Sequence, residues 1–287
     1  MAAFSFAPRF RRARLARPLA ALLLLGGLAG CASLDRDANA EAIAAPAGLK
    51  RMLIRTDPFW LTTFARLSDP ARPVTVYIEG DGLAWQSRSE PSRDPTPAEA
   101  QGLALAAADP GANVVYLARP CQFTARARNP SCGAAYWTSR RFAPEVIASI
   151  GQALDQIAAQ APGQKLHLVG YSGGGAVAVL AAARRQDVAS LRTVAGNLDP
   201  AEVSRLHQVS PLDGSLDPLA AAGAVARIPQ LHFNSASDRV IPPAIAERFV
   251  AATGPACARA VTVAGPSHDR GWTERWRGLL ATEPTCR

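Results

Sequence analysis

The chain has 287 residues, of which 48% are hydrophobic and 19% are charged, and its formal net charge is +8. Five arginines lie before residue 18 in a stretch without acidic residues, so removing residues 1–30 leaves a net charge of +3. No basic block remains in residues 31–287, and charge therefore gives no support to a nucleic-acid partner. A chain of this length buries one large core and fits a single domain.

Residues 1–30 have the pattern of an export signal. The arginines are followed by the apolar run 19–28, which is too short to span a bilayer, and then by small residues. The segment ends in Leu28-Ala29-Gly30-Cys31, which resembles a bacterial lipobox. The resemblance implies cleavage before Cys31 and attachment of acyl chains to this cysteine. An ordinary cleavage site with an incidental cysteine is the alternative.

The residue after Cys31 bears on the destination of the protein. Ala32 stands there in place of an aspartate, as in lipoproteins that are sorted to the outer membrane. The resemblance therefore implies a lipid-anchored protein of the bacterial cell envelope, held at the outer membrane and facing the periplasm. Its membrane contact would be made by the N-terminal lipid.

The rest of the chain is predicted to form a tether and one α/β domain. Residues 31–48 are rich in alanine and lack periodicity, which predicts a tether, and the domain is predicted to span residues 49–287. Apolar patterns in the domain predict alternating strands and helices, and hence a mostly parallel sheet with helices on both faces. The predicted strands are 51–55, 59–66, 74–78, 113–118, 166–169, 191–195, 230–234 and 260–263, and the predicted helices are 97–108, 142–159, 175–183, 243–252 and 273–281.

An insertion between residues 197 and 229 interrupts this alternation. Its pattern predicts two short helices, near 201–206 and 219–226. The insertion is interpreted as a small cap over the end of the sheet, with an ordinary crossover as the alternative.

Four cysteines remain after the export signal, namely Cys121, Cys132, Cys257 and Cys286. An even number in an exported chain predicts two disulfides. Of the three possible pairings, Cys121–Cys132 with Cys257–Cys286 closes the shortest loops and is the one we predict. The spacing does not match paired zinc ligands, so no metal site is predicted.

The run Gly170-Tyr171-Ser172-Gly173-Gly174 follows the strand 166–169 and precedes a run of small residues. A strand, a serine framed by glycines and a helix, in this order, are typical of a nucleophile elbow. The Gly173 amide is then at a helix N-terminus, where unpaired N–H groups favour a developing oxyanion. A plain glycine-rich turn is the alternative.

This order of elements resembles the α/β-hydrolase superfamily over nearly the whole domain. In that superfamily a nucleophilic serine is followed along the chain by an acid and then by a histidine. Ser172 matches the nucleophile, Asp238 lies in the matching loop after strand 230–234, and His268 follows the last strand. The resemblance implies that His268 takes the proton of Ser172 and that Asp238 orients the imidazole.

Other residues compete for these roles. Asp199 follows strand 191–195, where some relatives carry the acid, and Asp269 is interpreted as a loop cap. His167 and His232 lie within predicted strands and are interpreted as core histidines, and His207 is interpreted as an exposed helix residue.

The loop Glu79-Gly80-Asp81-Gly82 follows strand 74–78 and occupies the place of the His-Gly motif of many relatives, with a glutamate in place of the histidine. By this match the Asp81 amide is the second oxyanion donor, and Gly82 is a neighbouring candidate. An ionised carboxylate aimed at a developing oxyanion would oppose catalysis. Glu79 and Asp81 are therefore expected to be turned away or to be paired with an arginine, for which Arg119, Arg140 and Arg141 are available.

The resemblance thus implies a serine hydrolase that acts on carboxylic esters, small or lipid, through an acyl-enzyme and without a cofactor. A thioesterase, an amidase or an acyltransferase using the same site are alternatives. So is an envelope lipoprotein that keeps the fold without catalysis.

Overall fold

The computed structural model describes residues 1–2 and 35–287, and one compact unit extends from Arg36 to Arg287. The predicted lipobox with Cys31, and all but the first two residues of the predicted export signal, lie outside the described residues. Among the described residues, no helix is long and apolar enough to cross a membrane.

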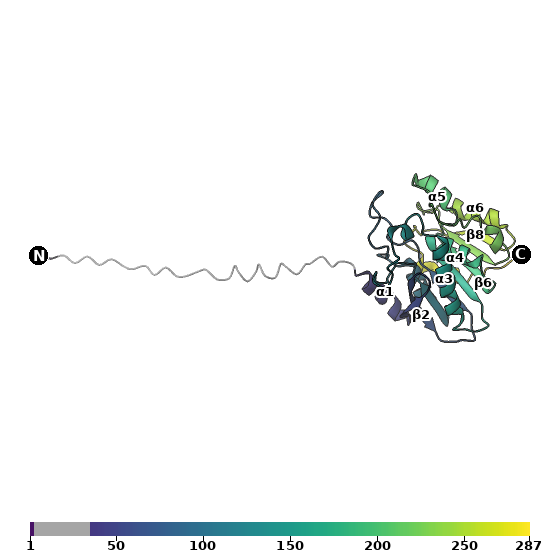
Figure 1. The fold of residues 1–287 in the computed structure, drawn as a ribbon, viewed down its shortest axis with the longest axis horizontal. Helices are drawn as coiled ribbons and strands as arrows, with labels where there is room; N and C mark the ends of the chain where they lie inside the picture. Colours follow the sequence, from purple (N-terminus) through teal and green to yellow (C-terminus); the bar gives the residue numbers. More distant parts are fainter. Residues whose placement is uncertain (3–34) are drawn as a thin grey trace. The chain divides into compact units, whose positions relative to one another are not determined.

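A sheet runs through this unit, with helices packed beside it (Figure 1). It has eight strands in the order β1-β2-β4-β3-β5-β6-β7-β8. β1 pairs antiparallel with β2 and β2 with β4, whereas all other neighbours are parallel. The mostly parallel sheet predicted from the sequence is therefore confirmed. The strands are β1 Lys50–Arg55, β2 Trp60–Leu67, β3 Val74–Ile78, β4 Asn113–Leu117, β5 Leu166–Tyr171, β6 Val188–Val194, β7 Gln230–Asn234 and β8 Ala258–Thr262.

Helices cover both faces of the sheet, because alternate strand residues point to opposite sides. In β3, Val76 and Ile78 belong to one core cluster and Tyr77 belongs to the other. The first cluster includes side chains of α3, Pro144–Ala158, of α4, Gly173–Ala182, and of α6, Pro243–Thr253. The second includes side chains of α1, Arg36–Ala44, of α2, Gln101–Ala108, and of α7, Thr273–Leu280.

The prediction of a tether over residues 31–48 is wrong for residues 36–48. Helix α1 and a 3-10 turn, Ala45–Ala47, occupy this segment, and Ala40 and Ala44 are buried in the second core cluster. Arg36 and Asn39 donate to backbone carbonyls that precede α2, with Arg36 Nη1 2.7 Å from the oxygen of Thr96. Alanine has the highest helix propensity, and two alanines four positions apart form a flat face that packs closely.

The insertion between β6 and β7 contains helix α5, Pro200–His207, and the 3-10 turn Ala222–Val225. The second predicted helix is thus a single short turn. Ser215 anchors the insertion to the segment before α3, since its hydroxyl donates to the oxygen of Ser139 at 2.7 Å and accepts from the amide of Phe142 at 3.1 Å. One side of the insertion borders the cavity described below.

Both predicted disulfides are present. Cys121–Cys132 closes a loop after β4, and Cys257–Cys286 joins the start of β8 to the end of the chain. The Cys121–Cys132 loop lies at the carboxyl end of the parallel strands, and Cys257 lies at their amino end.

His232 is a buried neutral histidine of β7, as its position in a strand predicted. Its side chain is inaccessible, its Nε2 lies 3.2 Å from Gln230 Oε1, and its Nδ1 lies 2.9 Å from Thr193 Oγ1. Gln230 Oε1 only accepts, so Nε2 carries the proton and Nδ1 accepts from Thr193. Burial lowers the pKa of His232 from 6.5 to about 3.

This histidine should make the fold sensitive to acid. Between pH 6.5 and pH 3 the unfolded chain binds a proton at His232 that the folded chain excludes, so stability falls as the pH is lowered. The loss is about 1.4 kcal/mol per pH unit, or about 2–3 kcal/mol at pH 4.5. Urea unfolding of the wild type and of His232→Gln between pH 7 and pH 4.5 checks this expectation. The dependence should be flatter in the variant by that amount, and parallel curves would contradict it.

Candidate active site

The turn between β5 and α4 holds Ser172 in a conformation that L-residues rarely adopt, with φ 49° and ψ −121°. Two glycines make this turn possible. A Cβ on Gly170 would lie 2.3 Å from the oxygen of Gly174, and a Cβ on Gly174 would lie 2.2 Å from the oxygen of Ile78. Any larger residue at either position would collide with backbone, so strand and helix pass closely only because both residues are glycine. The serine therefore stands at the carboxyl edge of the sheet.

Ser172, His268 and Asp238 form one hydrogen-bonded row. Ser172 Oγ lies 3.0 Å from His268 Nε2, and His268 Nδ1 lies 2.8 Å from Asp238 Oδ2. A carboxylate only accepts, so Nδ1 carries the proton and Nε2 is free to accept from the serine hydroxyl. The structure therefore brings together the three side chains that the sequence suggested. Ser172 and His268 are 96 residues apart in the chain.

Asp238 is positioned by its own loop. Its side chain is inaccessible, and its Oδ1 accepts from the amides of Val240 and Ile241, both at 2.8 Å. These bonds satisfy one carboxylate oxygen and leave Oδ2 directed at His268. The turn residues after β7 thus determine the orientation of the acid.

Tyr171 and Trp272 support the His268 loop, and sequence analysis did not single them out. The Tyr171 hydroxyl donates to the oxygen of His268 at 3.1 Å, and Trp272 Nε1 donates to the oxygen of Ser267 at 2.8 Å. Both side chains are buried. The position of Tyr171 directly before Ser172 was the one signal in the sequence that could have identified it.

The alternative acid, Asp199, has a structural role. Its Oδ1 accepts from the amide of Glu202 in the first turn of α5, and its Oδ2 lies 2.8 Å from Arg248 Nε. An aspartate that caps a helix and pairs with an arginine has neither oxygen left for His268.

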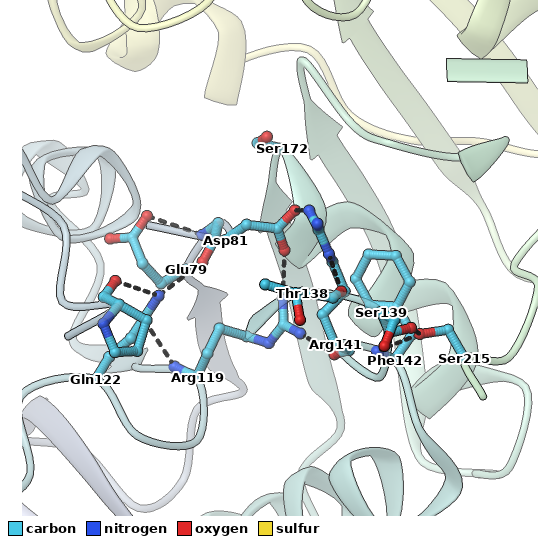
Figure 2. A network of polar contacts seen from close by, with 12 residues as sticks. Glu79, Asp81, Arg119, Gln122, Thr138, Ser139, Arg141, Phe142, Ser172 and Ser215 are labelled. Carbon is cyan, nitrogen blue, oxygen red and sulfur yellow. Dashed lines mark hydrogen bonds and ion pairs between the residues drawn. The ribbon is translucent and has the colours of Figure 1, made fainter. Parts of the chain in front are cut away.

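Asp81 is paired with two arginines, as one of the two expected arrangements required (Figure 2). Its Oδ2 lies 2.5 Å from Arg141 Nη1, and its Oδ1 lies 3.2 Å from Arg119 Nη1. Burial by itself would raise the pKa of Asp81, but the two guanidinium groups outweigh this effect and lower it. Arg140 is not involved, because it pairs with Glu145.

Glu79 is turned away from Ser172 and faces the start of α2. Its Oε1 accepts from the amide of Gly80 at 2.9 Å and from that of Gly102 at 3.1 Å. Burial raises the pKa of Glu79, and these backbone N–H groups offset part of that increase. A carboxylate at a helix N-terminus is stabilised by unpaired amides and by the helix dipole.

The two predicted oxyanion donors belong to loops that contact each other beside Ser172. A Cβ on Gly173 would lie 2.1 Å from Asp81 Oδ1, and a Cβ on Gly80 would lie 3.3 Å from Ser172 Cβ. Within residues 35–287, neither the Gly173 amide nor the Asp81 amide donates a hydrogen bond. Both N–H groups are therefore free to bind an oxygen.

A cavity of about 890 Å³ lies near the loop that carries Ser172, although neither Ser172 nor His268 is among its lining residues. Two of its lining residues are linked to that loop, since the Asn197 amide donates to the oxygen of Ser172 at 2.9 Å and Arg141 binds Asp81. Asn197 Oδ1 is buried there without a partner among the described residues. The lining combines apolar and polar side chains without a carboxylate: Trp85, Gln86, Ser87, Arg88, Thr138, Ser139, Arg141, Asn197, Pro200, Val203, Ser204, His207, Gln208, Val209, Ser210, Pro211 and Leu212.

No protein-family model matches the chain, and a search of curated proteins finds no match. Solved structures do match. Est1E from Butyrivibrio proteoclasticus aligns over 80% of this chain and 97% of its own, with a TM-score of 0.57 and 15% identity. An alpha-beta serine hydrolase homologue from Coxiella burnetii aligns over 80% of this chain and 93% of its own, with a TM-score of 0.53 and 15% identity.

A longer protein also shares the fold. The acylaminoacyl peptidase of Pyrococcus horikoshii aligns over 79% of this chain with a TM-score of 0.57 and 15% identity, but this chain spans only 38% of the peptidase. At such identities the likeness concerns the fold alone. The chain has the α/β-hydrolase fold, as its resemblance to that superfamily predicted.

The two aspartates provide a matched test of the acid. Asp238→Asn removes the carboxylate that holds the proton of His268 on Nδ1, and ester turnover should fall by about 10⁴-fold. Asp199→Asn should leave turnover within about threefold and should change stability little, because asparagine caps a helix about as well as aspartate does. Steady-state kinetics and urea unfolding of both variants check this. A larger loss of turnover in Asp199→Asn than in Asp238→Asn would show that Asp199, and not Asp238, is the acid.

Proposed function

We propose that the protein is a serine hydrolase that cleaves carboxylic esters at Ser172. The observation that carries the proposal is the hydrogen bond between Ser172 Oγ and His268 Nε2 at 3.0 Å, on a serine held at a strained turn. Strained backbone of this kind persists where the surrounding structure imposes it, and it gathers at reactive sites. The α/β-hydrolase fold, which an esterase among the matching structures shares, supports the same class of reaction.

In this mechanism the proton and the acyl group move in two balanced steps. Ser172 Oγ attacks the acyl carbonyl while His268 Nε2 takes its proton, and the imidazolium then gives that proton to the departing alkoxide. The acyl-enzyme is released by a water molecule, whose proton passes through His268 to Ser172 Oγ. Asp238 holds the imidazole and stabilises its charged form, and the Gly173 and Asp81 amides bind the oxyanion in both steps.

The cavity supports an amphipathic ester as the substrate. Its volume of about 890 Å³ falls within the range of small-molecule sites, and apolar side chains such as Trp85, Val203 and Leu212 line it beside hydroxyl and amide groups. A thioester, an amide or an acceptor alcohol would use the same row of side chains. Turnover of a panel of esters, thioesters and amides with one common acyl chain distinguishes these possibilities.

Ser172→Ala tests the proposal directly. The variant should keep the fold, because the substitution removes only the side-chain hydroxyl of Ser172. Its turnover of p-nitrophenyl butyrate should fall by at least about 10⁴-fold. A fluorophosphonate probe should label the wild type at Ser172 and leave the variant unlabelled. Equal turnover by both proteins would refute the proposal, and a wild type that resists the probe would favour a lipoprotein that keeps the fold without catalysis.

We further propose that the enzyme is anchored in the cell envelope by acyl chains on Cys31. The sequence Leu28-Ala29-Gly30-Cys31 and the two disulfides of the domain support export from the cytoplasm. Growth with an alkyne-tagged palmitate should label the full-length protein, and Cys31→Ser should abolish the label. Label that persists in Cys31→Ser would contradict the anchor.

A further inference from the structure

Both polar groups of the peptide bond between Gly80 and Asp81 have an assigned partner or role. Its N–H, on Asp81, is a proposed oxyanion donor, and its C=O, on Gly80, accepts from Gln122 Nε2 at 3.0 Å (Figure 2). A peptide unit is planar, and its C=O and N–H point in opposite directions. Whatever holds the Gly80 oxygen therefore also sets the direction of the Asp81 N–H.

Gln122 is itself held in one orientation. Its side chain is 1% exposed, and its Oε1 accepts from the amide of Arg119 at 3.1 Å. Because that amide only donates, the oxygen of the side-chain amide must face it, and the NH₂ group must face Gly80. If the side-chain amide were reversed, its NH₂ group would face the Arg119 N–H and its oxygen would face the Gly80 oxygen, and neither pair could form a hydrogen bond.

The neighbouring loop wraps closely around this side chain. Gly82 has a φ of +64°, and a Cβ there would lie 2.7 Å from Gln122 Nε2 and 2.0 Å from the oxygen of Pro95. The oxyanion loop thus reaches Gln122 only because residue 82 is glycine.

The backbone on both sides of Gln122 is constrained. Cys121 has a φ of 73° and is bonded to Cys132, and Phe123 has a φ of 54° with its amide bonded to Thr96 Oγ1 at 2.9 Å. Two residues other than glycine in the left-handed region need external contacts to remain there. The disulfide supplies such a contact before Gln122, and the hydrogen bond to Thr96 supplies one after it.

We infer that Gln122 is a positioning residue of the oxyanion hole, which aims the Asp81 N–H by holding the Gly80 oxygen, and that the Cys121–Cys132 bridge maintains Gln122 in place. Gln122 does not touch the substrate. Arg119 and Arg141 act on the same loop by a separate route, since they bind the Asp81 side chain. This inference rests on the proposed function of Ser172.

Gln122→Met and Gln122→Glu test the inference. Methionine fills the space without a donor, and an ionised glutamate keeps the acceptor for Arg119 but cannot donate to Gly80. With p-nitrophenyl butyrate at pH 8, kcat should fall by about 10- to 100-fold in both variants while KM changes by less than about threefold. Binding of a trifluoromethyl ketone, whose tetrahedral adduct places an oxyanion in the hole, should weaken in the same proportion as kcat/KM.

Gln230→Met is the matched control. Gln230 is equally buried and donates to the oxygen of Val225 at 2.7 Å, but it lies at the amino end of β7, away from Ser172. It should lose stability and keep kcat. Normal kcat and normal ketone binding in Gln122→Met would overturn the inference, and so would an equal loss of kcat in Gln230→Met.

The two disulfides give a second measurement that does not depend on the folding of the Gln122 variants. Cys121→Ala/Cys132→Ala should lower kcat and ketone binding, whereas Cys257→Ala/Cys286→Ala should lower stability alone. Equal kcat in the two double variants would overturn the inference. Failure of the proposed function is recognised separately, because Ser172→Ala would then turn over ester like the wild type.

Discussion

The close passage of the α4 N-terminus over the end of β3 is the constraint on which the rest of the site depends. Gly174 lies so near the oxygen of Ile78 that a single added carbon would collide with it. This contact brings the loop that continues from β3, Glu79 to Gly82, to the side of Ser172. The serine, its strained turn and the amides that face the same space are therefore products of one packing contact between backbones.

Two carboxylates of that loop, two positions apart, occupy opposite electrostatic environments. Asp81 is surrounded by two guanidinium groups that lower its pKa, and the cluster of Asp81, Arg119 and Arg141 keeps one excess positive charge. Within residues 35–287 no guanidinium group forms an ion pair with Glu79, and burial raises its pKa even though backbone amides offset part of the effect. An anionic loop beside the proposed oxyanion site would thus be compatible with the proposed reaction, because one group is neutralised and the other is turned toward α2.

Patterns within short segments of sequence were enough to predict the sheet, the disulfides and the three side chains of the row. The order Ser172, Asp238, His268 is visible because each residue follows a strand, and parallel strands end at the same edge. Gln122 could not be found in this way, since the role inferred for it depends on a contact with a carbonyl 42 residues earlier. Helix α1 was missed because its alanines do not produce a pattern of large apolar residues at helical spacing. Their contribution to packing becomes visible only in the structure, where Ala40 and Ala44 are buried in the core cluster that includes α2.

The position of α1 bears on the reach of the proposed anchor. A tether of residues 31–48 would let the domain move several nanometres from the bilayer, but the folded unit already begins at Arg36. Five residue steps from Cys31 to Arg36 span at most about 18 Å when fully extended. With so short a connection to the proposed lipid anchor, the domain would stay close to the membrane surface. The esters that it would meet there are lipids and molecules that cross this surface.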